Sequence, residues 1–125
     1  DVRAFDRRMW GSDPLESLDG NEHHAAHLGY FNLLLGLHRA IDPASRHAAL
    51  NDRITTALVR RLEASPLHLL ESYPREIYPV DNSAVIGSIG QHARVSGAAR
   101  LMTPSPTGVA ARVVRSPYAL EATRS

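Results

Sequence analysis

The sequence predicts a mostly α protein built of antiparallel helical hairpins that are joined by short extended loops. Three stretches carry apolar residues at intervals of three and four, the spacing that places them on one face of a helix. Pro and Gly interrupt this pattern between the stretches. The 125 residues, 43% of them hydrophobic and 22% charged, are enough for one globular domain. We therefore expect residues 1–125 to form a single helical-hairpin unit.

Composition excludes several classes of function. The 14 basic residues are all Arg and are balanced by 13 acidic residues, so the net charge of +1 predicts no nucleic-acid partner. The absence of Lys excludes a P-loop lysine and Schiff-base chemistry, and the absence of Cys excludes a thiolate metal site and a cysteine nucleophile. The longest apolar run, residues 33–37, is too short to span a membrane, and the charged first residues do not resemble a signal peptide.

The first predicted helix follows an irregular segment. Turn-forming residues at 10–14 and 19–21 predict no regular structure over residues 1–21. A helix is predicted from residue 22 to about 40, with Asp19 or Asn21 as its cap. It carries apolar or aromatic residues on two neighbouring faces, namely His27, Tyr30, Leu34 and Leu37 on one, and His24, Leu28, Phe31 and Leu35 on the other. This pattern predicts a central, buried helix.

The second predicted helix covers about 43–64. Asp42 is its expected cap, Pro43 its first residue, and Ser65-Pro66 its end. The expected apolar face consists of Leu50, Ile54, Ala57, Leu58 and Leu62, while the arginines at 46, 53, 60 and 61 lie mainly elsewhere. These features predict an outer, half-exposed helix. The short join to the first helix predicts an antiparallel hairpin.

The third predicted helix is entered from an extended loop. Residues 67–80 contain two Tyr-Pro pairs, and each Pro disfavours helix at the residue before it. A helix rich in small and apolar residues is predicted over about 82–96, with Asp81 or Ser83 as its cap and Gly97 at its end. This helix is the second candidate for burial. Residues 98–125 are expected to form a loosely structured tail with a short strand over 109–114.

A histidine cluster opens the first predicted helix, in the order Glu22-His23-His24-Ala25-Ala26-His27. His23 and His27 are four residues apart, so their rings can lie on one helical face and share a zinc ion. No third ligand is evident, and we predict no metal site. Two other interpretations stay open: a polar role in a pocket, or histidines at a helix start that bind only neighbours or solvent.

The most distinctive motif runs from Glu71 to Asn82. It carries tyrosines, glutamates and an arginine directly into the start of the third predicted helix. Tyr73 and Tyr78 can stack on a sugar, or hold an apolar substrate while offering a hydroxyl group. A carboxylate at Asp81 meets the positive end of the helix dipole. Asp81 is therefore either a helix cap or a functional acid.

Residues 71–82 with the small-residue helix that follows, together with His-Leu-Gly-Tyr-Phe-Asn at 27–32, resemble the joints between loops and inner helices in six-hairpin glycosidase-like enzymes. Within that group, residues 10–97 are most similar to linalool dehydratase-isomerase-like proteins. The resemblance implies an α/α toroid whose active site lies at the amino ends of the inner helices. A complete toroid has about a dozen helices, so the chain would be a portion of one.

This interpretation predicts an enzyme that acts by acid–base chemistry on a carbohydrate or a small hydroxylated substrate, by hydrolysis, elimination or epimerisation. Asp81 would be the general acid or base, and Glu22, His23 or His24 the opposing group. The expected substrate-binding residues are Trp10, His27, Tyr73, Glu76, Tyr78 and Asn82. No cofactor is expected, and no compartment is indicated.

A non-catalytic helical repeat or interaction module is the alternative, because stacked helical hairpins give the same periodicity. The two interpretations differ in whether Asp81 and the histidine cluster lie at the same end of the helices. In either case, the rest of the same chain or a partner chain is expected to cover the inner helices, since large apolar patches are rare on monomers.

Overall fold

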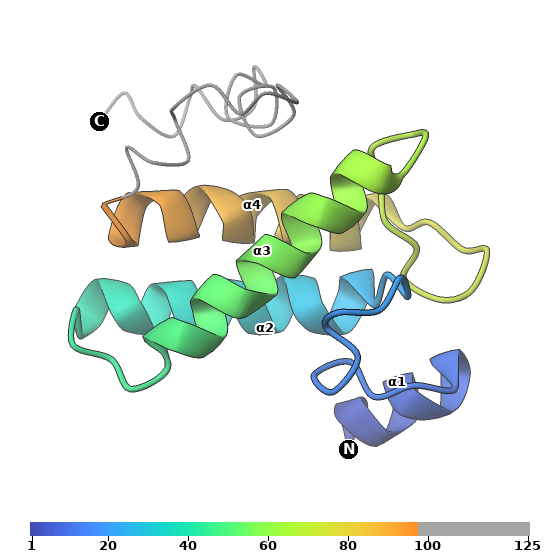
Figure 1. Cartoon of the computed structure of the whole chain (residues 1–125), viewed down its shortest axis with the longest axis horizontal. Helices are drawn as coiled ribbons and strands as arrows, with labels where there is room; N and C mark the ends of the chain where they lie inside the picture. The colour runs from blue at the N-terminus through green and yellow to red at the C-terminus, as the bar shows by residue number, and fades with distance from the viewer. Residues whose placement is uncertain (98–125) are drawn as a thin grey trace.

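The computed structural model describes residues 1–97, which form four helices packed together (Figure 1). The helices are α1 (Val2–Trp10), α2 (Ala25–Ile41), α3 (Ala48–Ala64) and α4 (Pro79–Val95). Residues 1–97 contain no strand, so the prediction of a mostly α protein is confirmed for this part of the chain. The predicted tail at 98–125 and the predicted strand at 109–114 lie outside the described residues.

The most extensive helix interface joins α2 and α4, which lie side by side and run in the same direction (Figure 1). Gly29 faces Val85, and Gly36 faces Gln91 further along both helices. The helix backbones approach closely at Gly29, where an added Cβ would lie 2.9 Å from Val85 Cγ2 and 3.0 Å from the Val85 backbone nitrogen. α3 returns obliquely across one face of this pair, and α1 lies near the amino end of α2 (Figure 1).

The core lies where α3 crosses the pair. Its buried apolar residues are Leu28 and Leu35 of α2, Ile54, Leu58 and Leu62 of α3, and Val85 and Ile89 of α4, with further contributions from the loops. The predicted inward face of α3 is therefore confirmed for Ile54, Ala57, Leu58 and Leu62, and Leu50 packs against this core while partly buried.

A buried polar network also connects these three helices. The side-chain amide of Asn32 in α2 donates to Thr55 Oγ1 in α3 at 2.9 Å and to Ser88 Oγ in α4 at 3.1 Å. Its carbonyl oxygen accepts from Asn51 Nδ2 at 2.7 Å. Because buried polar groups are costly unless paired, this network favours the one alignment of the helices that pairs them all.

The prediction that residues 1–21 are irregular is wrong for α1. The Asp1 side chain caps the helix by accepting from Arg3 N, and Gly11 ends it in the left-handed conformation at φ 74°. Arg7 and Arg8 suit the negative end of the helix dipole. Trp10, predicted to lie in a turn, is the last residue of the helix.

The predicted starts of the other helices also need correction. α2 begins at Ala25 after His24, so neither Asp19 nor Asn21 caps it. Asp42 follows the end of α2 and accepts from Ala44 N at 3.0 Å in a local turn, and α3 begins only at Ala48. Tyr78 occupies the cap position of α4, which begins with Pro79.

One arginine of the predicted outer face is buried. Arg61 lies under residues 17–23 and donates to the backbone oxygens of Ser17 at 2.7 Å, Leu18 at 3.1 Å and His23 at 3.2 Å. Burial lowers the pKa of its guanidinium to about 10, which still leaves it charged at neutral pH. The carbonyl groups of the loop before α2 explain this inward position, because they need a donor.

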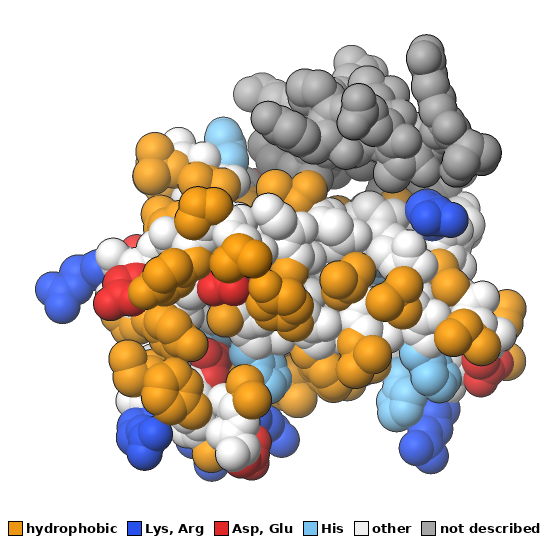
Figure 2. All heavy atoms as spheres, turned by 180° about the vertical axis from the view of Figure 1, so that it is seen from behind, with side chains coloured by type: hydrophobic (Ala, Val, Ile, Leu, Met, Phe, Trp, Pro, Cys, Tyr) orange, Lys and Arg blue, Asp and Glu red, His pale blue; other side chains and the backbone are white. Residues whose placement is uncertain are grey.

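Within residues 1–97 the face of α2 opposite α3 is exposed, so the prediction of a buried helix is not confirmed for that face. Tyr30, Leu34, Leu37 and Ile41 follow one another along this face, and 61% of Leu34 and 87% of Ile41 are exposed. Val80 of α4 is also exposed. Figure 2 shows the apolar side chains on this side of the molecule. No helix within residues 1–97 combines the length and apolar character needed to cross a membrane.

Candidate functional site

The loop before α4 lies on the amino end of α2. Ala25 N donates to Glu71 O at 3.1 Å, which ties the first residue of α2 to the loop. Asn82 of α4 holds the same loop from the other side, because its side chain accepts from Leu70 N at 2.7 Å and donates to Leu70 O at 2.9 Å. The amino ends of the two parallel helices and their entry loops therefore lie at one end of the molecule.

Asp81 lies in the first turn of α4 and is buried, with 9% of the residue exposed. Its carboxylate accepts from Ser72 Oγ at 2.5 Å, and the Ser72 backbone oxygen accepts from Trp10 Nε1 at 3.1 Å. Ser72 thus connects Asp81 to α1. Since Tyr78 occupies the cap position, the interpretation of Asp81 as the helix cap is wrong.

A three-residue cluster lies next to Trp10. The imidazole of His24 is fully buried between two polar side chains: its Nδ1 binds the Asp6 carboxylate, and its Nε2 lies 3.0 Å from Ser12 Oγ. The Trp10 and His24 rings lie 5.0 Å apart between centroids. His24 also adopts a left-handed backbone conformation at φ 48°, which is uncommon for residues other than Gly and is found disproportionately at functional sites.

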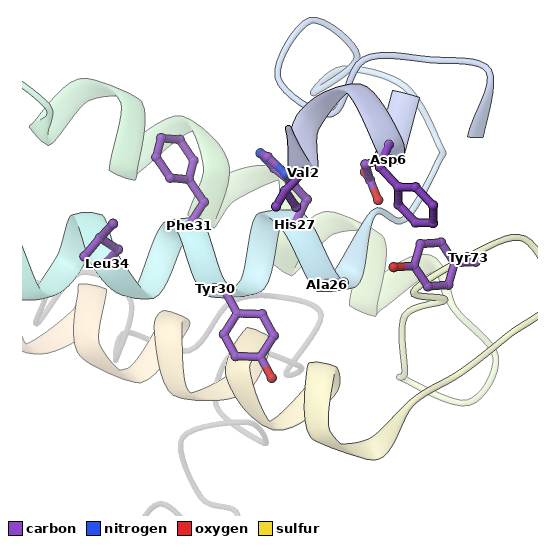
Figure 3. A pocket seen from close by; sticks show the side chains of 9 residues that line it. Val2, Asp6, Ala26, His27, Tyr30, Phe31, Leu34 and Tyr73 are labelled. Carbon is purple, nitrogen blue, oxygen red and sulfur yellow. The ribbon is translucent and has the colours of Figure 1, made fainter. Parts of the chain in front are cut away.

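A cavity of about 310 Å³ opens between α1, α2 and the loop before α4 (Figure 3). Most of its lining is apolar or aromatic, and the lining residues are Val2, Phe5, Asp6, Ala26, His27, Tyr30, Phe31, Leu34 and Tyr73. Figure 3 shows Asp6 and Tyr73 close together near one end, with Phe31 and Leu34 further along α2. A mostly apolar cavity of this size with a few convergent polar groups is typical of a small-molecule site.

The electrostatics of the cavity favour a protonated phenol at Tyr73. Burial raises the pKa of this phenol above its usual value, and the negative charges of Asp6 and Asp81 raise the pKa further, followed by that of Glu76. Tyr73 therefore remains a proton donor at neutral pH. Burial also lowers the pKa of the His27 imidazole, which favours its neutral form.

No protein-family model matches the chain, and no curated protein or solved structure was found to be similar to it. The relation to six-hairpin glycosidase-like enzymes therefore stays a prediction. The site is defined by the geometry of its own residues.

The predicted site residues divide into three groups. His27 and Tyr73 line the cavity. Trp10, His24, Asp81 and Asn82 lie behind it in the hydrogen-bonded joint between α1, α2 and α4. The remaining residues, Glu22, His23, Glu76 and Tyr78, do not line the cavity.

Three members of that last group form hydrogen bonds outside the cavity. His23 Nδ1 accepts from Glu71 N at 2.9 Å, and burial lowers the pKa of its imidazole. The Tyr78 hydroxyl donates to Glu76 Oε2 at 2.6 Å, and both residues are exposed. Within residues 1–97, no three His, Asp or Glu side chains are arranged to hold a metal ion, so the zinc interpretation of His23 and His27 finds no third ligand there.

Asp6, Ser12 and Ser72 are the residues of this region that the sequence did not indicate. Asp6 and Ser12 belong to the segment predicted to be irregular, where no periodic pattern draws attention to them. A usable signal was present in the Asp1 cap and the Gly11 stop, which together define a nine-residue helix and place Asp6 on the same face as Val2 and Met9.

Proposed function

We propose that this chain supplies an acid–base site to an α/α-toroid enzyme that acts on a small, largely apolar substrate with a hydroxyl group. One observation carries the proposal: a carboxylate and a phenol, Asp6 and Tyr73, line one end of a cavity that is otherwise mostly apolar. This lining favours the small hydroxylated substrate over a carbohydrate, because a sugar would need a polar partner for each of its several hydroxyl groups.

The two groups take complementary roles in this mechanism. The Tyr73 phenol, kept protonated by burial and by the neighbouring carboxylates, donates its proton to the substrate oxygen. The Asp6 carboxylate acts as the base and accepts a proton from a second position of the substrate. His24 fixes the orientation of Asp6 through its hydrogen bond. Asp81 holds Ser72, the residue before Tyr73, and so positions the phenol.

Two features of the fold support the toroid interpretation. α2 and α4 run parallel with their amino ends at one edge, as inner helices of a toroid do, and Asp81 and the histidine cluster lie at that same end. The exposed apolar face of α2 is the kind of surface that further hairpins would cover. In this proposal, the cover comes from the rest of the same chain or from a partner chain.

The test is a panel of small alcohols of graded apolar size incubated with the chain in D2O. Binding is followed by ligand NMR, and turnover by new products and by deuterium incorporation detected by mass spectrometry. We expect Tyr73→Phe and Asp6→Asn to lower turnover by about 10²-fold. Tyr78→Phe is the matched control, because it removes the hydroxyl of an exposed tyrosine in the same loop and should leave turnover unchanged.

The non-catalytic alternative is favoured by one observation, the exposed apolar face of α2. An interaction module needs such a face and needs no proton donor in the cavity. The acid–base proposal is refuted if alcohols of the panel bind but are neither converted nor labelled with deuterium, and if Tyr73→Phe leaves their binding unchanged. The interaction module then takes its place.

A further inference from the structure

We propose that Ser12 is an activated nucleophile that accepts the acyl group of a small, reactive ester, with His24 as its base and Asp6 as the residue that orients His24. Ser12 does not line the cavity, so this reactivity goes beyond the proposed function. Nothing in the proposed acid–base chemistry requires a covalent intermediate.

The hydrogen bonds of His24 fix the direction of proton transfer. An ionised carboxylate can only accept, so the bond between Asp6 and Nδ1 places the imidazole proton on Nδ1. The lone pair of Nε2 is then left to accept from the Ser12 hydroxyl at 3.0 Å. A nucleophile within reach of a base, and a base oriented by a third group, is the arrangement by which serine nucleophiles are activated on unrelated folds.

Burial and exposure in the cluster suit this role. His24 and Asp6 are almost completely buried, whereas Ser12 is half-buried and reaches the surface. A small reagent can therefore approach Ser12 from the solvent, while the base and its carboxylate stay shielded from water. The other Ser–His contact of the described residues lacks these features: His38 Nδ1 lies 2.9 Å from Ser45 Oγ, but Ser45 is buried, His38 is exposed, and no ion pair to a carboxylate is found for that ring.

The reaction balances with water as the only co-reactant. Ser12 Oγ attacks the ester carbonyl carbon while its proton moves to His24 Nε2, and the bond from that carbon to the leaving oxygen breaks as this proton is delivered to the leaving group. Water then attacks the acylated Ser12, giving its proton to Nε2. The acid is released, and the Ser12 hydroxyl is regenerated.

The first test uses p-nitrophenyl acetate and a fluorophosphonate probe on the chain of 125 residues. We expect one probe adduct, located at Ser12 by peptide mass spectrometry, and p-nitrophenol release that falls at least tenfold in Ser12→Ala. Ser17→Ala is the matched control, because Ser17 is a half-buried serine of the same segment whose hydroxyl donates to the Asp13 backbone oxygen and not to an imidazole. An adduct absent from Ser12, or ester cleavage equal in Ser12→Ala and wild type, overturns the proposal.

The second test leaves His24 itself unchanged. The chain has no Cys, so Ser12→Cys introduces a single thiol beside His24. We expect the pKa of this thiol, followed by thiolate absorbance, to be at least about one unit lower in the folded chain than in the same chain unfolded in urea. Asp6→Asn in the Ser12→Cys background should reverse most of that difference.

Other charged groups lie close to position 12 in the chain. Arg3 and Arg7 bind Asp13, the next residue in the chain, and Asp6→Asn leaves all three in place. A thiol pKa that is equal in the folded and unfolded chains, or one that Asp6→Asn does not move, shows that His24 is not a base for position 12 and overturns the proposal.

Discussion

Replacing Gly29 by Ala tests the close approach of α2 to α4. Gly29 lies in the amino-terminal half of α2, against α4, and a Cβ there would meet Val85 Cγ2 at 2.9 Å, the Val85 backbone nitrogen at 3.0 Å and the Asp81 backbone oxygen at 3.3 Å. The Val85 side chain can rotate, but the two backbone atoms cannot. The new methyl group therefore fits only if one helix moves away from the other.

Two opposing contributions set the size of the effect. Ala is favoured over Gly within a helix by about 1 kcal/mol. Overpacking a tight core contact costs about 1–3 kcal/mol, and a backbone obstacle places this site toward the upper end of that range. We therefore expect Gly29→Ala to lower the free energy of unfolding by about 1–2 kcal/mol, which corresponds to a fall in Tm of about 4–8 °C for each kcal/mol.

The assay is urea unfolding followed by circular dichroism at 222 nm, with Gly87→Ala as the matched control. Gly87 lies in α4, is exposed, and has no heavy atom within 4 Å of an added Cβ, so only the helix preference acts there and stability should rise by about 1 kcal/mol. Gly36→Ala should fall between the two, because its tightest contact is the flexible Gln91 side chain. A Gly29→Ala chain as stable as Gly87→Ala would refute the close parallel packing of α2 and α4.

Three further predictions concern charged groups. Arg61→Met keeps the apolar volume but removes three hydrogen bonds from a buried guanidinium to backbone oxygens, and of these oxygens only Ser17 O and Leu18 O keep a second donor. We therefore expect a loss of about 3 kcal/mol in urea unfolding, and an unchanged midpoint would contradict the buried position. Burial works to raise the pKa of the Asp13 carboxyl, but hydrogen bonds from Arg3 and Arg7 outweigh it and hold this pKa well below its usual range. The ionised Asp13 carboxylate therefore stabilises the folded chain above its unfolded pKa of about 4, and this stabilisation is lost as the pH falls below about 4. Urea midpoints measured at pH 5, 4 and 3 should consequently fall less steeply in Asp13→Asn than in wild type. Asp81→Asn keeps an acceptor for Ser72, so turnover on the alcohol panel should stay within about tenfold of wild type; a loss of about 10²-fold would make Asp81 itself the catalytic acid or base.

The three long helices were predictable because their apolar spacing and their breakers agree. Ser65-Pro66 ends α3 where expected, and α2 and α4 cover most of their predicted ranges. Helix starts were less predictable, because Asp42-Pro43 forms a local turn as readily as a cap. α1 was missed because four of its nine residues are charged, and because its stability depends on a cap, a glycine stop and ion pairs that apolar spacing does not reveal.

The spacing of apolar residues did not show which face of the first predicted helix the other helices cover. Both faces of the first predicted helix are apolar, which predicted a central, buried helix, but within residues 1–97 α3 and α4 cover only the side that holds Leu28, Asn32 and Leu35. The same limit applies to the site. The sequence indicated Tyr73 and the histidine cluster because aromatic and ionisable residues gather there, but the partner of His24 lies 18 residues away in a helix that was not itself predicted.

The position of Asp6 follows from the electrostatics of two parallel helices. Side by side, α2 and α4 place the positive ends of both dipoles at one edge, where a carboxylate is stabilised. α4 carries its own acid in the first turn, Asp81, whereas α2 has none there. α1 supplies the missing charge, because Asp6 reaches the start of α2 through His24. The amino ends of the two helices are therefore each matched by one buried carboxylate, and Tyr73 lies within the field of both.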